Sequence, residues 1–203
     1  MKKTAVITVT SEGQGIVEAL SMTERVGGEA GLDRKGNLHL RLLSEEMFGL
    51  LRGIAGEVEA SYWLETEDKH FEIKMSADVK MTSEMKEQFL AASKSGKNEA
   101  ARGFMGRVRV MIAGFLLSAK EALPYAVINS AASMPMGGYA GESSSVWSMA
   151  LYKAEMAKRS GEGGEADEAW DELEKSIVAN IADDVKVGVR GNRVELTVVK
   201  TFA

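Results

Sequence analysis

The sequence predicts an α+β fold, a two-layer sandwich with helices packed on one face of a mixed, mostly antiparallel sheet. Two hairpin patterns support this class. Residues 57–65 and 70–79 alternate apolar and polar side chains on either side of a polar turn. Residues 185–190 and 193–202 do the same around Gly191-Asn192, a dipeptide typical of tight hairpin turns. The long segments outside these hairpins space their apolar residues as helices do, so helices should cover the sheet.

Length and composition favour one domain over residues 1–203, with a full core. The chain has no cysteine, which excludes disulfides and thiolate metal sites. The two histidines, His39 and His70, are too few for a histidine metal site or a Ser-His-Asp relay, so surface or strand-packing roles are favoured. No metal site is therefore predicted.

Charge and hydropathy limit the partners and the location. The net charge of −5 gives no general attraction to phosphate backbones, so nucleic acid is not expected as a partner. The longest apolar run, residues 110–117, is far shorter than the ~20 residues that a membrane helix needs. The N-terminus begins with lysines, as a signal peptide does, but threonines interrupt its apolar run. We therefore expect a cytoplasmic protein without membrane contact.

The N-terminal segment should form a strand and then a helix. Residues 3–10 alternate apolar and polar side chains as a half-buried strand does. Residues 11–30 have helical spacing and begin at a capping residue, Ser11, although glycines weaken the pattern. The SEGQG at residues 11–15 lacks the Gly-Lys-Ser/Thr of a phosphate-binding loop, so a helix start is the favoured interpretation.

The chain is organised around a helix over residues 38–56, and Asp33 precedes it as a cap. One face of this helix carries an apolar stripe of Leu40, Leu43, Met47, Leu50, Leu51 and Ile54. The opposite face carries Glu45, Gly49 and Arg52. The helix therefore has one face for the core and another for a second role.

The rest of the chain mixes helices with segments that have no period. Further helices are predicted over residues 82–92, 98–122, 146–158 and 167–182. Residues 129–145 are rich in Ser, Gly, Ala and Met, which indicates a functional or disordered loop, and residues 160–165 read as a linker. The N-terminal strand and one strand of the C-terminal hairpin should form the edges of the sheet.

The central helix and the hairpin after it resemble a known family. LLSEEMFGLLRGI at residues 42–54 is similar to the N-box helix of the GHKL, or histidine-kinase-like, ATPase fold, above all that of the anti-sigma-factor serine kinases. FEIKMSADVKM at residues 71–81 resembles the strand that leads to their DxGxG motif. SKSGKNEAARGFMGRVRVMI at residues 93–112 resembles their ATP lid and the glycine-rich turn that opens the next helix.

The resemblance implies a nucleotide site. Glu45 matches the glutamate that acts as the base, and Asp78 matches the aspartate that binds the adenine amino group. Gly103 and Gly106 match the turn that approaches the phosphates at a helix N-terminus. Gly49 stands where the family has the asparagine that holds magnesium, and it offers no ligand atom. ATP is thus the implied cofactor, with magnesium only if the site is functional.

The resemblance extends over roughly residues 1–120 and 165–203, so residues 124–164 look like an insertion. Lys80 and Thr82 replace the two glycines that the family needs after the aspartate for close approach to the nucleotide.

Each matched residue also has a plain structural interpretation. For Glu45 and Glu46 a solvated helix position is the favoured interpretation, whereas Asp78 is equally a strand-end or turn residue. Gly49 and Gly53 would let another backbone pack close to the helix, which is the favoured interpretation for both. Gly103 and Gly106 lie within a helical stripe, which argues equally for helix packing. The basic residues Arg102, Arg107 and Arg109 form a solvated helix face more often than an anion site.

These departures predict a regulatory protein of the anti-sigma-factor type with an impaired nucleotide site, which acts by binding another protein. The implied partner is sigma-factor-like or anti-anti-sigma-like, and a homodimer is left open. The alternative is an active ATP-binding serine/threonine kinase or ATPase that uses Glu45. A third hypothesis is an unrelated α+β binding domain.

Overall fold

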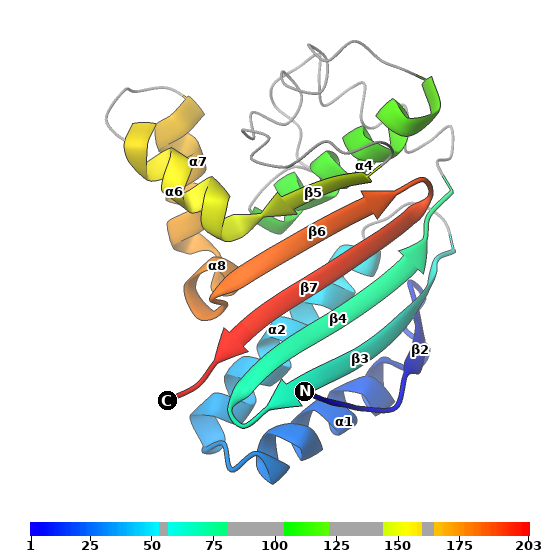
Figure 1. Cartoon of the computed structure of the whole chain (residues 1–203), viewed down its shortest axis with the longest axis vertical. Helices are drawn as coiled ribbons and strands as arrows, with labels where there is room; N and C mark the ends of the chain where they lie inside the picture. Colours follow the sequence, from blue (N-terminus) through cyan, green and yellow to red (C-terminus); the bar gives the residue numbers. More distant parts are fainter. Residues whose placement is uncertain (53–56, 81–103, 122–143, 160–164) are drawn as a thin grey trace.

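The computed structural model describes residues 1–52, 57–80, 104–121, 144–159 and 165–203, and within them the protein is α+β with a mostly antiparallel sheet (Figure 1). The strands are β1 Lys2–Lys3, β2 Ile7–Thr10, β3 Glu59–Glu67, β4 His70–Asp78, β5 Ser144–Ser148, β6 Asp184–Arg190 and β7 Arg193–Thr201. The helices are α1 Ile16–Glu29, α2 Arg34–Arg52, α4 Phe104–Glu121, α6 Met149–Arg159, α7 Glu165–Lys175 and α8 Ile177–Ile181.

The two predicted hairpins lie side by side in the centre of the sheet. The strand order is β1-β3-β4-β7-β6-β5, with β2 beside β1 on β3, and every described pair is antiparallel. β4 and β7 pair along their whole length, from His70 opposite Thr201 to Asp78 opposite Arg193. Two hairpins that are far apart in sequence thus form one continuous surface (Figure 1).

One edge of the sheet differs from the prediction. Among the described strands, β1 and β2 form one edge as expected, but β5 pairs with β6, so no strand of the C-terminal hairpin is an edge. β5 was missed because Ser144–Ser148 is short and follows a serine-rich stretch that has no alternation. The helix predicted over residues 146–158 begins instead at Met149.

A β-bulge divides the N-terminal strand into β1 and β2. Lys3 lies opposite Glu65 and Ile7 opposite Tyr62, so the N-terminal strand advances four residues while β3 advances three. The extra residue bends the strand at this edge. A bulge and two exposed lysines at an edge hinder pairing with a second sheet, which protects this strand from aggregation.

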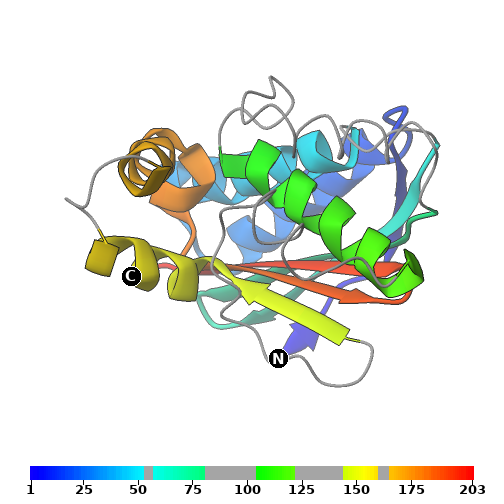
Figure 2. The same ribbon diagram turned by 90° about the horizontal axis from the view of Figure 1, so that it is seen from above.

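The helices α1, α2 and α4 lie on one face of the sheet (Figure 2). Strand residues that face these helices are largely apolar and buried, and they are Ile7, Val9, Ala60, Tyr62, Leu64, Phe71, Ile73, Met75, Ala77, Trp147, Val185, Val187, Val189, Val194, Leu196 and Val198. The alternate residues include an ion-pair cluster in which Lys74 Nζ lies 2.7 Å from Glu65 and 2.8 Å from Glu72. The alternation predicted from the sequence therefore separates the core from the polar face.

The helix that follows β2 starts later than predicted. α1 begins at Ile16 because the preceding turn contains Gly13 and Gly15, both with positive φ, so the predicted start at Ser11 is wrong. The Thr10 amide donates to the Gln14 carbonyl within this turn. For α2 the predicted cap is confirmed, since the Asp33 carboxylate accepts a hydrogen bond from the Gly36 amide at 2.7 Å. The helix directly follows this cap at Arg34, so the predicted start at residue 38 is wrong, and the predicted end over 53–56 lies outside the described residues.

Two side chains set helix starts in the C-terminal part of the chain. Asp184 of β6 accepts a hydrogen bond from the Ala150 amide at 2.9 Å and so satisfies an amide in the first turn of α6. Ser176 caps α8 by accepting a hydrogen bond from the Ala179 amide. The single helix predicted over residues 167–182 is therefore two helices, α7 and α8. The helix predicted over residues 98–122 is confirmed for its described part, Phe104–Glu121.

Other predicted segments lie outside the described residues, namely the helix over 82–92, most of the loop over 129–145 and most of the linker over 160–165. None of the described helices is both long and apolar enough to cross a membrane.

Candidate functional site

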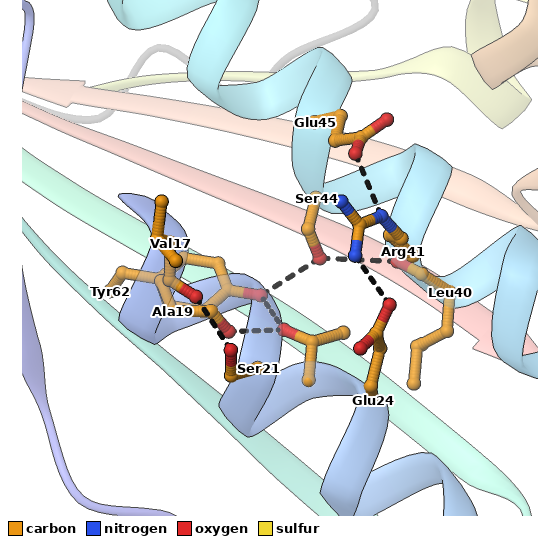
Figure 3. A network of polar contacts seen from close by, with 10 residues as sticks. Val17, Ala19, Ser21, Glu24, Leu40, Arg41, Ser44, Glu45 and Tyr62 are labelled. Carbon is orange, nitrogen blue, oxygen red and sulfur yellow. Dashed lines mark hydrogen bonds and ion pairs between the residues drawn. The ribbon is translucent and has the colours of Figure 1, made fainter. Parts of the chain in front are cut away.

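Glu45 is held in an ion-pair triad on the outer surface of α1 and α2 (Figure 3). Arg41 Nε donates to the Glu45 carboxylate at 2.9 Å, and Arg41 Nη1 donates to Glu24 of α1. The hydrogen bond to Glu24, and then that to Glu45, raises the pKa of Arg41. In this arrangement Arg41 links α2 to α1, and the Glu45 carboxylate is paired with Arg41 within α2 instead of standing free as a general base.

Gly49 is exposed on the outer face of α2, one turn after Glu45. A Cβ built at this position would meet no other atom within 4 Å. The interpretation that Gly49 admits a closely packed backbone is therefore wrong for the described structure. Gly49 supplies neither a metal ligand nor a packing contact.

Alanine at position 49 is expected to raise the free energy of unfolding by about 0.5–1 kcal/mol, because glycine costs that much inside a helix and the site has room for a methyl group. Urea denaturation measures the change. Gly27→Ala is the matched control in α1, since its Cβ would lie 2.2 Å from Asn37 Oδ1 and should destabilise the protein. A loss of stability in Gly49→Ala would contradict the expectation.

Asp78 lies on the face of the sheet opposite to α2. It is exposed at the end of β4, whereas Ala77 and Val79 on either side of it are buried, at 8% and 1% exposure. Its cross-strand neighbour in β7 is Arg193. Glu45 and Asp78 therefore do not share a pocket. The alternation of β4 could have shown this from the sequence, because Asp78 is out of phase with the inward residues Phe71, Ile73 and Met75.

The glycine pair of the predicted phosphate turn is described only in part. Gly106 lies in the first turn of α4 and is buried, and Gly103 lies outside the described residues. Among the residues that the structure describes, no group of His, Cys, Asp or Glu could hold a metal ion. The candidate residues thus do not assemble into one site within the described part of the chain.

Comparisons with protein-family models, curated proteins and solved structures found no match. The resemblance to the GHKL family therefore stays a hypothesis based on the residues quoted for it.

A buried hydroxyl network lies beneath the ion-pair triad, and sequence reasoning missed it (Figure 3). Tyr62 Oη of β3 is 2.7 Å from Thr23 Oγ1 of α1 and 2.8 Å from Ser44 Oγ of α2. All three side chains are fully buried, at 0% exposure. The network fixes both helices to the sheet under the face that carries Glu45. A polar residue inside the apolar stripe, Ser44, was the available signal.

The geometry indicates the direction of the hydrogen bonds in this network. The hydroxyl groups supply three protons for four contacts, because Thr23 also reaches the Ala19 carbonyl at 2.8 Å and Ser44 the Leu40 carbonyl at 3.1 Å. The longest contact is the best candidate to lack a proton. The favoured order is then Ser44 donating to Tyr62, Tyr62 donating to Thr23, and Thr23 donating to Ala19. Such a network rigidifies the surface above it without offering a reactive group.

An open cavity of about 640 Å³ lies between β1 and the C-terminal end of α1. Its charged lining residues carry both signs, for example Lys2 and Arg25 against Glu29 and Asp68. Arg25 and Glu29 already form an ion pair at 4.0 Å. The cavity contains neither Glu45 nor Asp78, and its mixed charges do not indicate one class of ligand.

Proposed function

We propose that this chain is a regulatory protein of the anti-sigma-factor type, which binds a protein partner and does not turn over ATP. The proposal includes the finer description of the fold, a two-layer sandwich of the histidine-kinase-like kind. Its support is the order of elements along the chain. The N-terminal strand, α1 and α2 come before the β3–β4 hairpin, and α4 comes after it. The β6–β7 hairpin closes the chain and lies beside the first hairpin in the sheet. A cytoplasmic location and a sigma-factor-like or anti-anti-sigma-like partner are parts of the same proposal.

The observation that carries the proposal is the state of the outer face of α2. Catalysis by the route that the resemblance implies needs a free carboxylate and a magnesium ligand one turn away. The carboxylate of Glu45 is instead hydrogen-bonded to Arg41, and the next turn presents the bare backbone of Gly49. Asp78 lies on the other face of the sheet, which supports an impaired adenine site as well.

Titration with ATP and magnesium tests the absence of turnover. We expect no release of phosphate above the buffer rate and no phosphorylation of a candidate partner. Turnover that Glu45→Gln abolishes would contradict the proposal and establish the alternative, an active kinase or ATPase. Glu46→Gln is the matched control, because it removes the adjacent carboxylate and leaves the contact of Glu45 with Arg41 in place.

Partner binding needs a separate measurement. Purified sigma factors and anti-anti-sigma proteins from the source organism would be titrated against the labelled chain by fluorescence anisotropy. The expected result is saturable binding to one of them without nucleotide. If none binds while Mg-ATP is hydrolysed, the regulatory proposal is wrong.

A further inference from the structure

Arg109 of α4 is a partly buried cation that has no partner among the described residues. Its Nε–H is fully buried and has no hydrogen-bond acceptor. Burial is the cause that lowers the pKa of Arg109, and no acidic group offsets it. A buried Nε–H without an acceptor costs free energy, because burial removes its water without supplying another hydrogen bond.

Two other partly buried cations of this chain show what is missing at Arg109, whereas a third, Lys153, donates to the Ala179 carbonyl. Lys74, whose side chain is 22% exposed, forms ion pairs with Glu65 and Glu72. Lys200, whose side chain is 20% exposed, forms an ion pair with Asp183 at 2.9 Å. The fold therefore supplies carboxylates to these ammonium groups, and the lack of one at Arg109 needs a separate explanation.

The acidic groups on the described elements that pack against α4 do not pair with Arg109. Within α4 the single acidic residue is Glu121, which lies twelve residues further along the helix. α4 contacts α2, β6 and α7. On α2 the Glu45 carboxylate is bonded to Arg41, and on β6 the Asp184 carboxylate is bonded to Ser148 and to the Ala150 amide. No acid on α2, including Glu46, or on α7 contributes to the pKa of Arg109.

We propose that Arg109 anchors a binding site for a small oxyanion, the phosphoryl or carboxylate group of a ligand. The guanidinium presents its donors in a planar fork that matches the oxygens of such groups, and a charge-assisted pair would offset the cost of the buried Nε–H. A neutral acceptor would satisfy the Nε–H but leave the charge uncompensated, so an anion fits better. This inference rests on Arg109 alone and does not depend on the proposed regulatory function.

The side-chain Nε–H resonance of Arg109 gives a direct test in the intact protein without magnesium. Pyrophosphate and succinate are titrated separately, so that the group that binds is identified as phosphoryl or carboxylate. We expect a saturable shift of this resonance with one of them, and about tenfold weaker binding in Arg109→Gln. Arg25→Gln is the control, because Arg25 is an exposed arginine on α1. The absence of any shift up to about 10 mM of both probes would overturn the proposal.

The denaturant midpoint provides a second test. An arginine that only supports the fold would not give the result expected here. Arg109→Met removes the charge and keeps an unbranched apolar side chain. It should raise the denaturant midpoint in buffer and abolish the further rise that the bound anion causes in the wild type. A lower midpoint for Arg109→Met in buffer, or an undiminished rise with the anion, would overturn the proposal. Neither result bears on ATP turnover, so failure here is distinguishable from failure of the regulatory proposal.

Discussion

Replacing Gly15 by alanine is expected to lower the free energy of unfolding by about 3 kcal/mol or more. Gly15 has φ +72, and a Cβ there would lie 2.0 Å from the Thr8 carbonyl oxygen and 3.1 Å from its carbon. Both atoms belong to the backbone of β2, so the clash cannot be relieved by a side-chain rotation. The turn between β2 and α1 would have to open, which would move the edge strand away from β3 or displace the start of α1.

Gly31→Ala separates the clash from the backbone strain. Gly31 has φ +73, nearly the same as Gly15, but nothing lies within 4 Å of its Cβ position. Its substitution should therefore cost only the left-handed conformation of a non-glycine residue, about 1 kcal/mol. Urea denaturation of the two variants gives the difference. Equal losses of stability would show that contact with Thr8 contributes nothing.

The hairpins could be predicted because their signals are local. Alternation and a polar turn specify β3 with β4, and Gly191-Asn192 specifies β6 with β7, where Gly191 adopts φ +59. The start of α1 could not be predicted, because the need for glycine at position 15 comes from the carbonyl of Thr8 on another element. β5 also depends on another element, since its short, serine-rich sequence has no alternation of its own and pairing with β6 makes it a strand.

The candidate site also contains contacts that can be predicted from local sequence and contacts that cannot. The pairing of Arg41 with Glu45 follows from their spacing of four residues on one helix and could have been read from the sequence. The contact of Arg41 with Glu24 could not, because it depends on how α1 packs against α2. Arg109 likewise could not be predicted. Its sequence neighbours favour a solvated helix face, and the lack of a partner is evident only once the burial of Nε is known.

The stability of the protein is expected to fall steeply between pH 10 and pH 12 because of Tyr62. Burial, opposed by the hydrogen bonds to Ser44 and Thr23, raises the pKa of Tyr62 from 10.0 to about 12. A raised pKa means that the folded state favours the neutral phenol. This contribution is fully present below pH 10, where the unfolded chain is also protonated, and is lost as the pH rises through 12. Two pKa units correspond to roughly 2–3 kcal/mol.

Tyr62→Phe isolates this effect from the titration of lysines over the same range. The variant keeps the ring that packs against Phe48 at 5.0 Å. Thr23 keeps its bond to the Ala19 carbonyl, and Ser44 can donate to the Leu40 carbonyl in place of Tyr62. At neutral pH it should lose about 1 kcal/mol, the usual net value of a buried hydrogen bond. Above pH 10 the wild type should lose stability faster than the variant, so that near pH 12 the variant is the more stable of the two. Urea denaturation followed by tryptophan fluorescence at each pH measures both curves. Parallel curves would mean that the phenol of Tyr62 ionises as readily in the folded protein as in the unfolded chain. The hydroxyl network would then not hold α1 and α2 to the sheet in the way that its geometry indicates.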